Sequence, residues 1–235
     1  MIKKVLIIVP AYNEAEVIGQ TLESLEGAQY DVLVVDDGST DATSNVAGQF
    51  DVSVISHVRN MGQGAAIRTG FAYALSHKYD AVVTFDADGQ HAVENIEMLI
   101  DWLEEKVVDI CLGTRFGSTV SAIPWKRKAL LQCARWVDFA FSGILLSDSH
   151  NGLRAIRTEA LKNMVLLSDR MEHASEIIWE VKRLHLKYHE VPVMIYYRRF
   201  AHKKGQSLAN ALRIFFSLMV LKKKRFQFFK NGNGN

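Results

Sequence analysis

The chain has 235 residues, of which 49% are hydrophobic and 23% charged, which suits one globular domain with at most a small appendage. Its two cysteines, Cys111 and Cys133, exclude a disulfide framework and lack metal-ligand spacing, so we expect buried thiols in a reducing compartment. The net charge of +2 hides an asymmetry. Ten lysines and arginines and no acidic residue follow Glu190, which leaves −8 on the first 190 residues. This favours contact of the tail with phosphates or an anionic membrane, and no nucleic-acid-binding module is recognisable.

The first half of the chain alternates apolar, β-branched runs with segments whose apolar residues recur at helical spacing. The expected strands cover residues 4–9, 32–35, 52–57, 80–85 and 107–112, and the expected helices cover 14–26, 62–77, 96–106 and a segment that ends near 49. Pro10 should stop the first strand, and Ser39 or Thr40 could cap the helix after the second. The apolar run near the N-terminus is too short for a signal peptide. Nearly continuous apolar strands between helices predict an α/β fold with a Rossmann-like, mostly parallel sheet flanked by helices.

The pattern changes after residue 115, where we expect the surface that receives a second substrate. The expected elements there are a largely helical stretch over 125–146, an extended segment over 154–156, a helix over 172–186 and a strand over 191–197 with Pro192 near its start. We therefore expect a domain over 1–207, with halves 1–115 and 116–207, then a basic amphipathic helix over 208–230 and a disordered tail over 231–235.

The C-terminal helix bears on contact with a membrane. Residues 208–221 are mostly apolar, but these 14 residues are short of the roughly 20 that cross a bilayer. Three lysines and an arginine at 222–225 precede Phe226, Phe228 and Phe229. This basic and aromatic pattern suits a helix lying on anionic lipid, and it equally suits a helix packed on the domain with a solvated end. We predict peripheral association with a membrane.

Three of the predicted strands end in residues that can bind ligands, over 10–14, 36–39 and 86–88. Because the carboxyl ends of parallel strands meet at one edge of a sheet, these segments should converge. The two aspartates of the third segment offer the hard oxygen ligands that Mg²⁺ or Mn²⁺ prefers, although a solvated acidic turn would look the same. An aspartate of the second segment could accept hydrogen bonds from a base or a ribose, and Tyr12 could stack on the base.

Two glycines, Gly62 and Gly64, stand at the start of the helix over 62–77. They would allow the backbone to approach a polar ligand closely. The spacing is not that of a GxGxxG motif and does not follow the first strand, which argues against a dinucleotide cofactor.

Four motifs carry a resemblance to a known family. They are VPAYNE at 9–14, VDDGSTD at 35–41, NMGQG at 60–64 and DADGQH at 86–91. In this order they resemble the family 2 glycosyltransferases of the GT-A fold, and the likeness is closest to dolichol- or polyprenyl-phosphate sugar transferases. The resemblance is dense over residues 4–115 and extends to about 208.

The resemblance implies roles for individual residues. Those expected to bind the nucleotide are Pro10, Ala11, Tyr12, Glu14, Asp36, Asp37, Gly64, Asp86 and Ala87. Asp88 and Gln90 would hold Mg²⁺ or Mn²⁺ against the diphosphate. The candidate catalytic residues are Asp88, Arg115 and Glu176. Arg115 would contact a phosphate, and Glu176 is a candidate base if the acceptor is a sugar hydroxyl.

The acceptor side is implied less completely. Asp148 and Arg154 belong to a segment that resembles the family's D-x-x-x-G-F/L-R element. His202 takes the position of a phosphate-binding arginine of relatives, and the neighbouring Arg199, Lys203 or Lys204 could substitute for the missing contacts. Polyprenyl-phosphate relatives usually carry R-x-x-G-x-S-K there, but this chain has histidine and leucine at the Arg and Lys positions, at 202 and 208. This departure weakens the case for dolichol-phosphate mannose synthesis in particular. We expect no function for His173.

The implied activity is an inverting, metal-dependent transfer of a hexose from a UDP- or GDP-linked sugar to a polyprenyl or dolichyl phosphate. The enzyme would act in the cytoplasm, on the inner face of the cell membrane, without nucleic acid, and a membrane protein could be its partner. One alternative is transfer to a sugar hydroxyl in polysaccharide or glycolipid assembly, which needs a base such as Glu172 or Glu176. Another is a nucleotide-binding adaptor without turnover. A sugar nucleotidyltransferase should have a Gly-rich basic loop after the first strand, and this chain does not.

Overall fold

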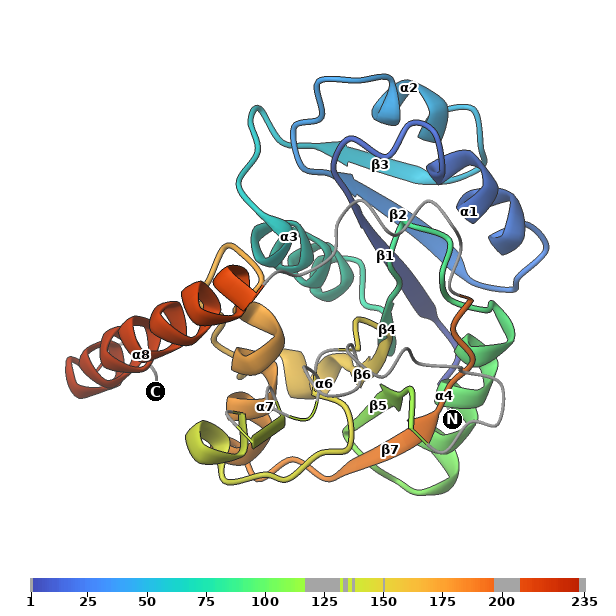
Figure 1. The fold of residues 1–235 in the computed structure, drawn as a ribbon. Coiled ribbons are helices and arrows are strands. Elements are labelled where there is room, and N and C mark those ends of the chain that lie inside the picture. Colours follow the sequence, from blue (N-terminus) through green and yellow to red (C-terminus); the bar gives the residue numbers. More distant parts are fainter. Residues whose placement is uncertain are drawn as a thin grey trace.

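The computed structural model describes residues 2–116, 132, 135, 136, 138–149, 151–196 and 208–232, and over 208–216 it describes the backbone alone. Among these residues, seven strands form one sheet in the order β3-β2-β1-β4-β6-β5-β7 (Figure 1). The strands are β1 (Val5–Ala11), β2 (Asp31–Asp36), β3 (Ser53–Ser56), β4 (Ala81–Thr84), β5 (Ile110–Thr114), β6 (Arg154–Arg157) and β7 (Tyr188–Pro192). β6 runs antiparallel to β4 and β5, and the other pairs are parallel, so the prediction of a mostly parallel sheet is confirmed.

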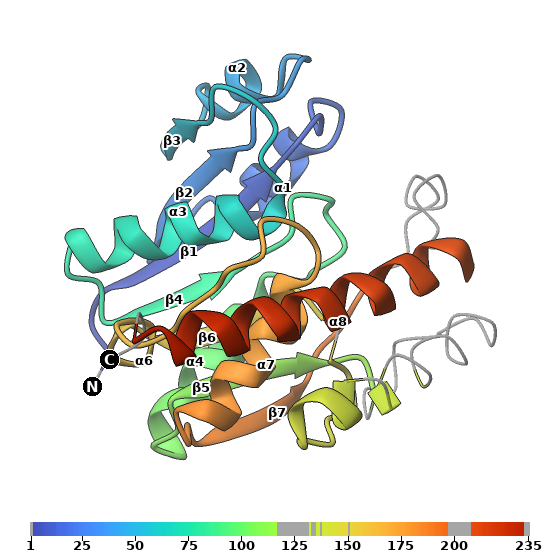
Figure 2. The ribbon, with the colours of Figure 1, turned by 90° about the vertical axis from the view of Figure 1, so that its left-hand side faces the viewer.

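Helices cover both faces of this sheet (Figures 1 and 2). They are α1 (Ile18–Leu25), α2 (Thr43–Ala47), α3 (Gln63–Ser76), α4 (Glu94–Glu105), α6 (Thr158–Leu161), α7 (His173–Arg183) and α8 (Leu208–Lys230). α1 and α4 pack on one face, and α3, α6 and α7 pack on the other. Successive residues of β1 enter the two cores in turn: Ile7 and Val9 enter the first, and Leu6 and Ile8 enter the second. This alternation explains why the strand is apolar without interruption.

Pro10 does not end the first strand as predicted. β1 continues through Pro10, opposite Val35, to Ala11. On its other side, β1 pairs with β4 only as far as Ile8. The missing N–H of Pro10 therefore falls where β4 has already ended, and no ladder hydrogen bond is lost.

Two local predictions were wrong. Neither Ser39 nor Thr40 caps α2; the carboxylate of Asp41 accepts the hydrogen bond of the Thr43 amide at 3.0 Å. β7 lies earlier than expected, so that Pro192 ends the strand and does not begin it. β7 is the last strand of the described sheet and pairs with β5 through its backbone, so it needs no long apolar run.

The second half ends in α8, whose bounds match the helix predicted over 208–230. α8 lies on the far side of α7 from the sheet, where Leu218 and Leu221 pack against Trp179 (Figure 2). In the part of the chain that the structure describes, no helix is both long enough and apolar enough to cross a membrane. Most of the helix predicted over 125–146 lies outside the described residues. Its described end is helical over 138–142, and Gly143, with φ of 73°, follows.

Candidate active site

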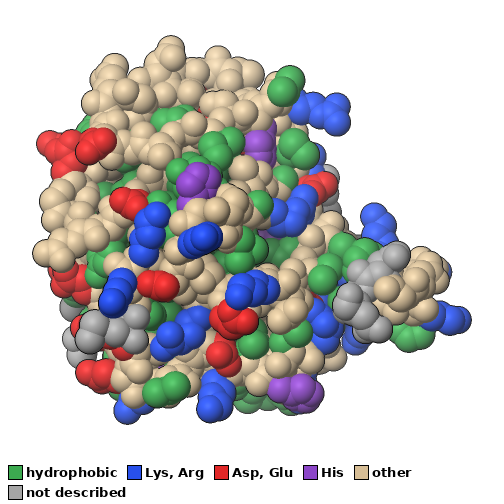
Figure 3. Space-filling model, turned by 180° about the vertical axis from the view of Figure 1, so that it is seen from behind, with side chains coloured by type: hydrophobic (Ala, Val, Ile, Leu, Met, Phe, Trp, Pro, Cys, Tyr) green, Lys and Arg blue, Asp and Glu red, His purple; other side chains and the backbone are tan. Residues whose placement is uncertain are grey.

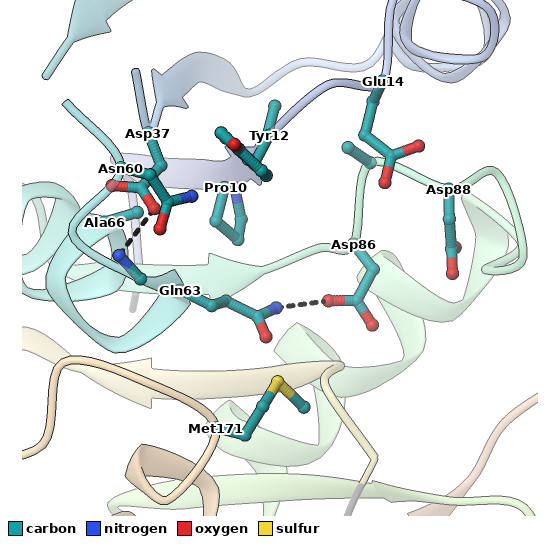
Figure 4. A pocket seen from close by; sticks show the side chains of 13 residues that line it. Pro10, Tyr12, Glu14, Asp37, Asn60, Gln63, Ala66, Asp86, Asp88 and Met171 are labelled. Carbon is teal, nitrogen blue, oxygen red and sulfur yellow. Dashed lines mark hydrogen bonds between the residues drawn. The ribbon is translucent and has the colours of Figure 1, made fainter. Parts of the chain in front are cut away.

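The carboxyl ends of β1, β2 and β4 meet at one pocket of about 390 Å³ (Figure 4). The start of α3 and Met171 complete its wall. The lining residues are Pro10, Ala11, Tyr12, Glu14, Asp37, Asn60, Gly62, Gln63, Ala66, Asp86, Ala87, Asp88 and Met171. The expected convergence of the three strand ends is therefore present in the fold.

The pocket is strongly acidic. Its lining residues include four carboxylates and no lysine or arginine. Glu14 and Asp88 lie side by side at one end, and Asp37 lies at the other (Figure 4). A diphosphate carries negative charge itself, so this pocket would repel it unless a cation bound with it.

Asp37 joins the end of β2 to the loop before α3. Its two carboxylate oxygens accept hydrogen bonds from the amides of Met61, at 2.9 Å, and Gly62, at 2.6 Å. His57 Nδ1 lies 2.8 Å from Oδ1, and His57 Nε2 lies 2.9 Å from the Thr69 hydroxyl. Asp37 thus fixes the loop that forms one side of the pocket, and it faces the pocket as well.

Asp86 is held on two sides. His91 Nε2 donates to Oδ2 at 3.2 Å, and Gln63 Nε2 donates to Oδ1 at 3.2 Å. Burial by itself would raise the pKa of Asp86, but the hydrogen bond from His91 and the positive charges nearby, including Arg154, outweigh it and lower the pKa. Gly152 packs directly on this carboxylate, because a Cβ there would lie 2.8 Å from Oδ1.

Asp88 stands in the opposite electrostatic position. Burial and the negative charges of Asp86 and Glu14 raise its pKa. Its carboxylate accepts the Gln90 amide at 3.1 Å and contacts the Gln90 side chain. Such a carboxylate would gain most from a bound cation.

The residues fit a metal ion that is shared with a substrate. Among the residues described, no three His, Cys, Asp or Glu side chains form a complete metal site. Mg²⁺ is commonly bound by one or two carboxylates together with substrate phosphates and water, and Asp88 with Gln90 offers such a partial set.

Two predicted nucleotide contacts lie away from the pocket lining. Asp36 is buried, and its carboxylate accepts the Ser39 amide at 3.1 Å within the loop. Gly64 does permit a close backbone approach, but its partner is the chain itself: a Cβ would lie 2.5 Å from the carbonyl oxygen of Ser168. The prediction of a ligand approach at Gly64 is corrected accordingly.

The predicted arginines are both buried, and Arg154 lies close enough to Asp86 for the two charges to interact. Arg115 forms a two-pronged ion pair with Asp148, with Nε–Oδ2 of 2.5 Å and Nη2–Oδ1 of 2.7 Å. Arg154 donates to the carbonyl oxygens of Ser149 and Asn151, and burial lowers its pKa to about 10. Arg115 therefore already has a carboxylate partner, whereas the described hydrogen bonds of Arg154 go to the backbone.

Glu176 lies away from the pocket, fully buried in α7. Its carboxylate accepts the amides of Leu167 and Ser168 and pairs with Arg225 of α8, with 3.0 Å between Nη1 and Oε1. This placement contradicts a role for Glu176 as a base at the acceptor. The predicted contacts Arg199, His202 and Lys203 lie outside the described residues.

The structure adds residues that sequence reasoning missed. Gln63, Asn60 and Met171 line the pocket. His173, expected to be without function, is buried close to Asp86; burial lowers its pKa to about 4, so the ring is neutral at pH 7. Asn60 and Gln63 belong to the NMGQG motif at 60–64, which could have indicated that they lie at the site. Nothing in the local sequence around Met171 indicates such a position.

Comparison with known proteins agrees with this geometry. The model of the family described as glycosyl transferase family 2 matches residues 6–165. The chain is 30% identical to the UDP-N-acetylglucosamine–dolichyl-phosphate N-acetylglucosaminyltransferase of Methanococcus voltae, over 94% of this chain and 96% of that protein. It is also 30% identical to the undecaprenyl-phosphate mannosyltransferase of Micrococcus luteus, over 89% of this chain and 93% of that protein.

The fold has solved counterparts. Glucosyl-3-phosphoglycerate synthase from Mycobacterium tuberculosis, in complex with phosphoglyceric acid, has a TM-score of 0.71 at 18% identity, over 92% of this chain and 77% of that one. The same enzyme with Mn²⁺, UDP and glucosyl-3-phosphoglycerate has a TM-score of 0.68 at 19% identity, over the same shares of the two chains. These likenesses establish the GT-A fold. Together with the family match and its four motifs around one acidic pocket, they show that this chain belongs to glycosyl transferase family 2.

Proposed function

We propose that the protein transfers a hexose from a UDP- or GDP-linked sugar to a polyprenyl or dolichyl phosphate, with inversion at the anomeric carbon. Two relatives at 30% identity that span nearly the whole chain are named for transfer to dolichyl or undecaprenyl phosphate, which supports this acceptor class. The observation that carries the proposal is the burial of Glu176. Of the two candidate bases for a hydroxyl acceptor, Glu172 and Glu176, the second is buried and already hydrogen-bonded to the backbone.

The donor would lie in the acidic pocket. Tyr12 is exposed there and would stack on the base, and the remaining acceptor capacity of Asp37 would bind a base or ribose donor. Asp88 and Gln90 would hold Mg²⁺ or Mn²⁺ together with the diphosphate. When bound, this ion neutralises the charge that develops on the departing diphosphate. The hydrogen bonds from Gln63 and His91 keep the carboxylate of Asp86 in one orientation in this pocket.

The acceptor oxygen is then anionic before it reacts. A lipid phosphate attacks the anomeric carbon without giving up a proton, so the site needs charge balance and orientation more than a base. Arg154, with a buried guanidinium close to Asp86, contributes positive charge behind the reacting atoms. Glu172 is the remaining candidate base for a hydroxyl acceptor, and its carboxylate accepts the hydroxyl of Ser168 at 3.1 Å.

We also propose that the protein acts on the inner face of the cell membrane. The exposed face of α8 carries Lys222, Lys223, Lys224 and Lys230, together with Met219, Val220 and Phe226. On the part that projects at the right of Figure 3, blue (Lys or Arg) and green (hydrophobic) side chains lie together. A helix of this kind binds anionic lipid through its lysines and buries its apolar side chains at the interface.

The test is a transfer assay with a panel of donors. UDP-N-acetylglucosamine, UDP-glucose and GDP-mannose, each labelled in the sugar, are supplied with Mn²⁺ and vesicles that contain undecaprenyl or dolichyl phosphate. We expect label from at least one donor in the organic phase, and none with the Asp88→Asn variant. Label that passes to an oligosaccharide without any polyprenyl phosphate would support the hydroxyl acceptor instead. Absence of transfer from every donor would contradict the proposal.

A further inference from the structure

Two arginines and two glutamates form a cluster where α8 meets α7. Glu176 and Glu180 of α7 have fully buried side chains, and Arg225 of α8 has a side chain only 8% exposed. Arg225 Nη1 donates to Glu176 at 3.0 Å, and its Nη2 pairs with Glu180. Arg183 Nε donates to Glu180 at 2.9 Å. The two positive and two negative charges balance, and removal of one arginine would leave a buried carboxylate without its full charge partner.

The same cluster binds the backbone of a neighbouring segment, residues 165–168. Val165 donates its amide to Glu180 at 2.7 Å, and its carbonyl oxygen accepts Arg225 Nη1 at 2.7 Å. The amides of Leu167 and Ser168 donate to Glu176, at 3.1 and 2.7 Å. The position of this segment therefore depends on where the two carboxylates are held.

The continuation of that segment forms a wall of the candidate donor pocket. Arg68 Nη1 donates to the carbonyl oxygen of Ser168 at 2.7 Å, and the amide of Ala65 donates to that of Asp169 at 3.1 Å. Gly62 and Gly64 leave no room for a Cβ against these two carbonyl groups. Met171, two residues further on, lines the pocket itself. One continuous set of contacts thus joins Arg225 to the pocket.

We propose that Arg225 is a positioning residue for the donor pocket, acting through Glu176 and residues 165–171. This inference rests on the proposed function, in which that pocket holds the nucleotide-sugar. Without Arg225, two buried carboxylates would face the single charge of Arg183, and Glu176 would lose the ion pair that holds its side chain. Without that ion pair, Glu176 would hold the two amides less firmly, and the wall that carries Met171 would shift.

The arrangement has a consequence for the membrane contact. Arg225 points inward from α8, whereas Lys223 and Lys224 are exposed on its outer side. The helix that we propose for lipid binding therefore also supports the donor pocket. Substitution of neighbouring residues on the two sides should separate these effects.

The experiment compares Arg225→Met with the matched control Lys224→Met, which removes the same charge from the exposed side of the helix. The dissociation constants of UDP and of GDP with Mn²⁺ are measured by calorimetry on folded protein. We expect Arg225→Met to raise the dissociation constant at least fivefold and Lys224→Met to leave it within twofold. Binding to vesicles with anionic lipid should weaken in Lys224→Met and stay near the wild-type value in Arg225→Met. If Arg225→Met does not fold, Arg225→Lys, which keeps the charge but not the fork, should give a smaller rise.

Hydrogen exchange and a double-mutant cycle distinguish positioning from stability alone. Exchange at the amides of residues 165–168 should accelerate in Arg225→Met and not in Lys224→Met. Because both changes would act on one wall, the effects of Arg225→Met and Met171→Ala on nucleotide binding should not be additive. Unchanged nucleotide binding per folded molecule, or additive effects, would overturn the proposal. If the wild-type protein binds neither nucleotide, the proposed function fails, and the exchange rates still decide whether Arg225 holds the wall.

Discussion

Gly152→Ala adds one methyl group against the carboxylate of Asp86. Gly152 precedes β6 by two residues, and the Thr84 hydroxyl, at the end of β4, donates to its carbonyl oxygen at 2.5 Å. The added Cβ would lie 2.8 Å from Asp86 Oδ1 and 2.9 Å from Cγ, whereas ordinary contact begins at 3.4 Å. Because the Gly152 backbone is held by Thr84 and leads directly into β6, which lies between β4 and β5, we expect the Asp86 side chain to move instead.

The added Cβ would lie closest to Asp86 Oδ2, and for Oδ1 the difference between 2.8 and 3.4 Å already sets a displacement of at least 0.6 Å. Both hydrogen bonds of Asp86, from His91 and Gln63, are already 3.2 Å long, so such a shift would break at least one of them. A misplacement of about 1 Å can cost about 100-fold in rate. We therefore expect kcat/KM to fall by about 10- to 100-fold, which is about 1.4 to 2.7 kcal/mol of transition-state stabilisation.

Gly70→Ala provides a matched control. A Cβ at Gly70 would lie 2.5 Å from Cγ2 of Ile8, in the core between α3 and β1. Both substitutions overpack a tight contact, and each should lower the free energy of unfolding by about 1–3 kcal/mol. The assays are urea unfolding and transfer rates per folded molecule. Wild-type kcat/KM in Gly152→Ala, or an equal loss in Gly70→Ala, would refute the reasoning about Asp86.

Three further outcomes are expected. Asp88→Asn should weaken Mn²⁺-dependent nucleotide binding by about 10–100-fold in calorimetry, and equal binding with and without Mn²⁺ in the wild type would contradict the metal assignment. Asp148→Ala leaves the buried guanidinium of Arg115 without its carboxylate and should lower the free energy of unfolding by about 3–5 kcal/mol in urea; a loss below about 1 kcal/mol would mean that Arg115 finds another partner. His173 has a pKa of about 4 in the fold and an ordinary value of 6.5, so the unfolded chain binds the extra proton between these values. Stability should therefore fall by up to about 3 kcal/mol as the pH drops from 6.5 to 4, and His173→Asn should remove this part of the slope.

The fold could be predicted largely because its determinants are local. The first strand is apolar at every position since Val5, Ile7 and Val9 face one core, while Leu6 and Ile8 face the other. A run of this kind is typical of a strand covered on both faces, and the helices between such strands follow from their spacing. The edge strand β7 was misplaced because pairing along one side asks little of its side chains.

The candidate site could be predicted where its residues sit at strand ends, and not where distant contacts decide. Asp86 and Asp88 directly follow a strand, and the ends of parallel strands lie at one edge of the sheet, so their place in the pocket could be predicted. Glu176 is paired with Arg225, which is 49 positions away in the sequence. The sequence of the helix alone does not show this pairing, and it therefore suggests a carboxylate that is free to act as a base. The sequence predicts a ligand next to Gly64, but the space beside this glycine is filled by the carbonyl group of Ser168, a residue far away in the sequence.

The two aspartates of the central motif are two residues apart, yet their surroundings make them chemically different. Asp86 receives hydrogen bonds from His91 and Gln63, and positive groups outweigh its burial, so its pKa is lowered and its charge is already balanced by the protein. Burial, together with the negative charges of Asp86 and Glu14, raises the pKa of Asp88. A carboxylate whose neighbours oppose its ionisation gains the most from a divalent cation. For the proposed donor site we therefore expect a divalent cation to bind at Asp88, while Asp86 stays fixed by its hydrogen bonds to His91 and Gln63. If Asp86→Asn were to abolish Mn²⁺ dependence while Asp88→Asn retained it, this division of roles would have to be reversed.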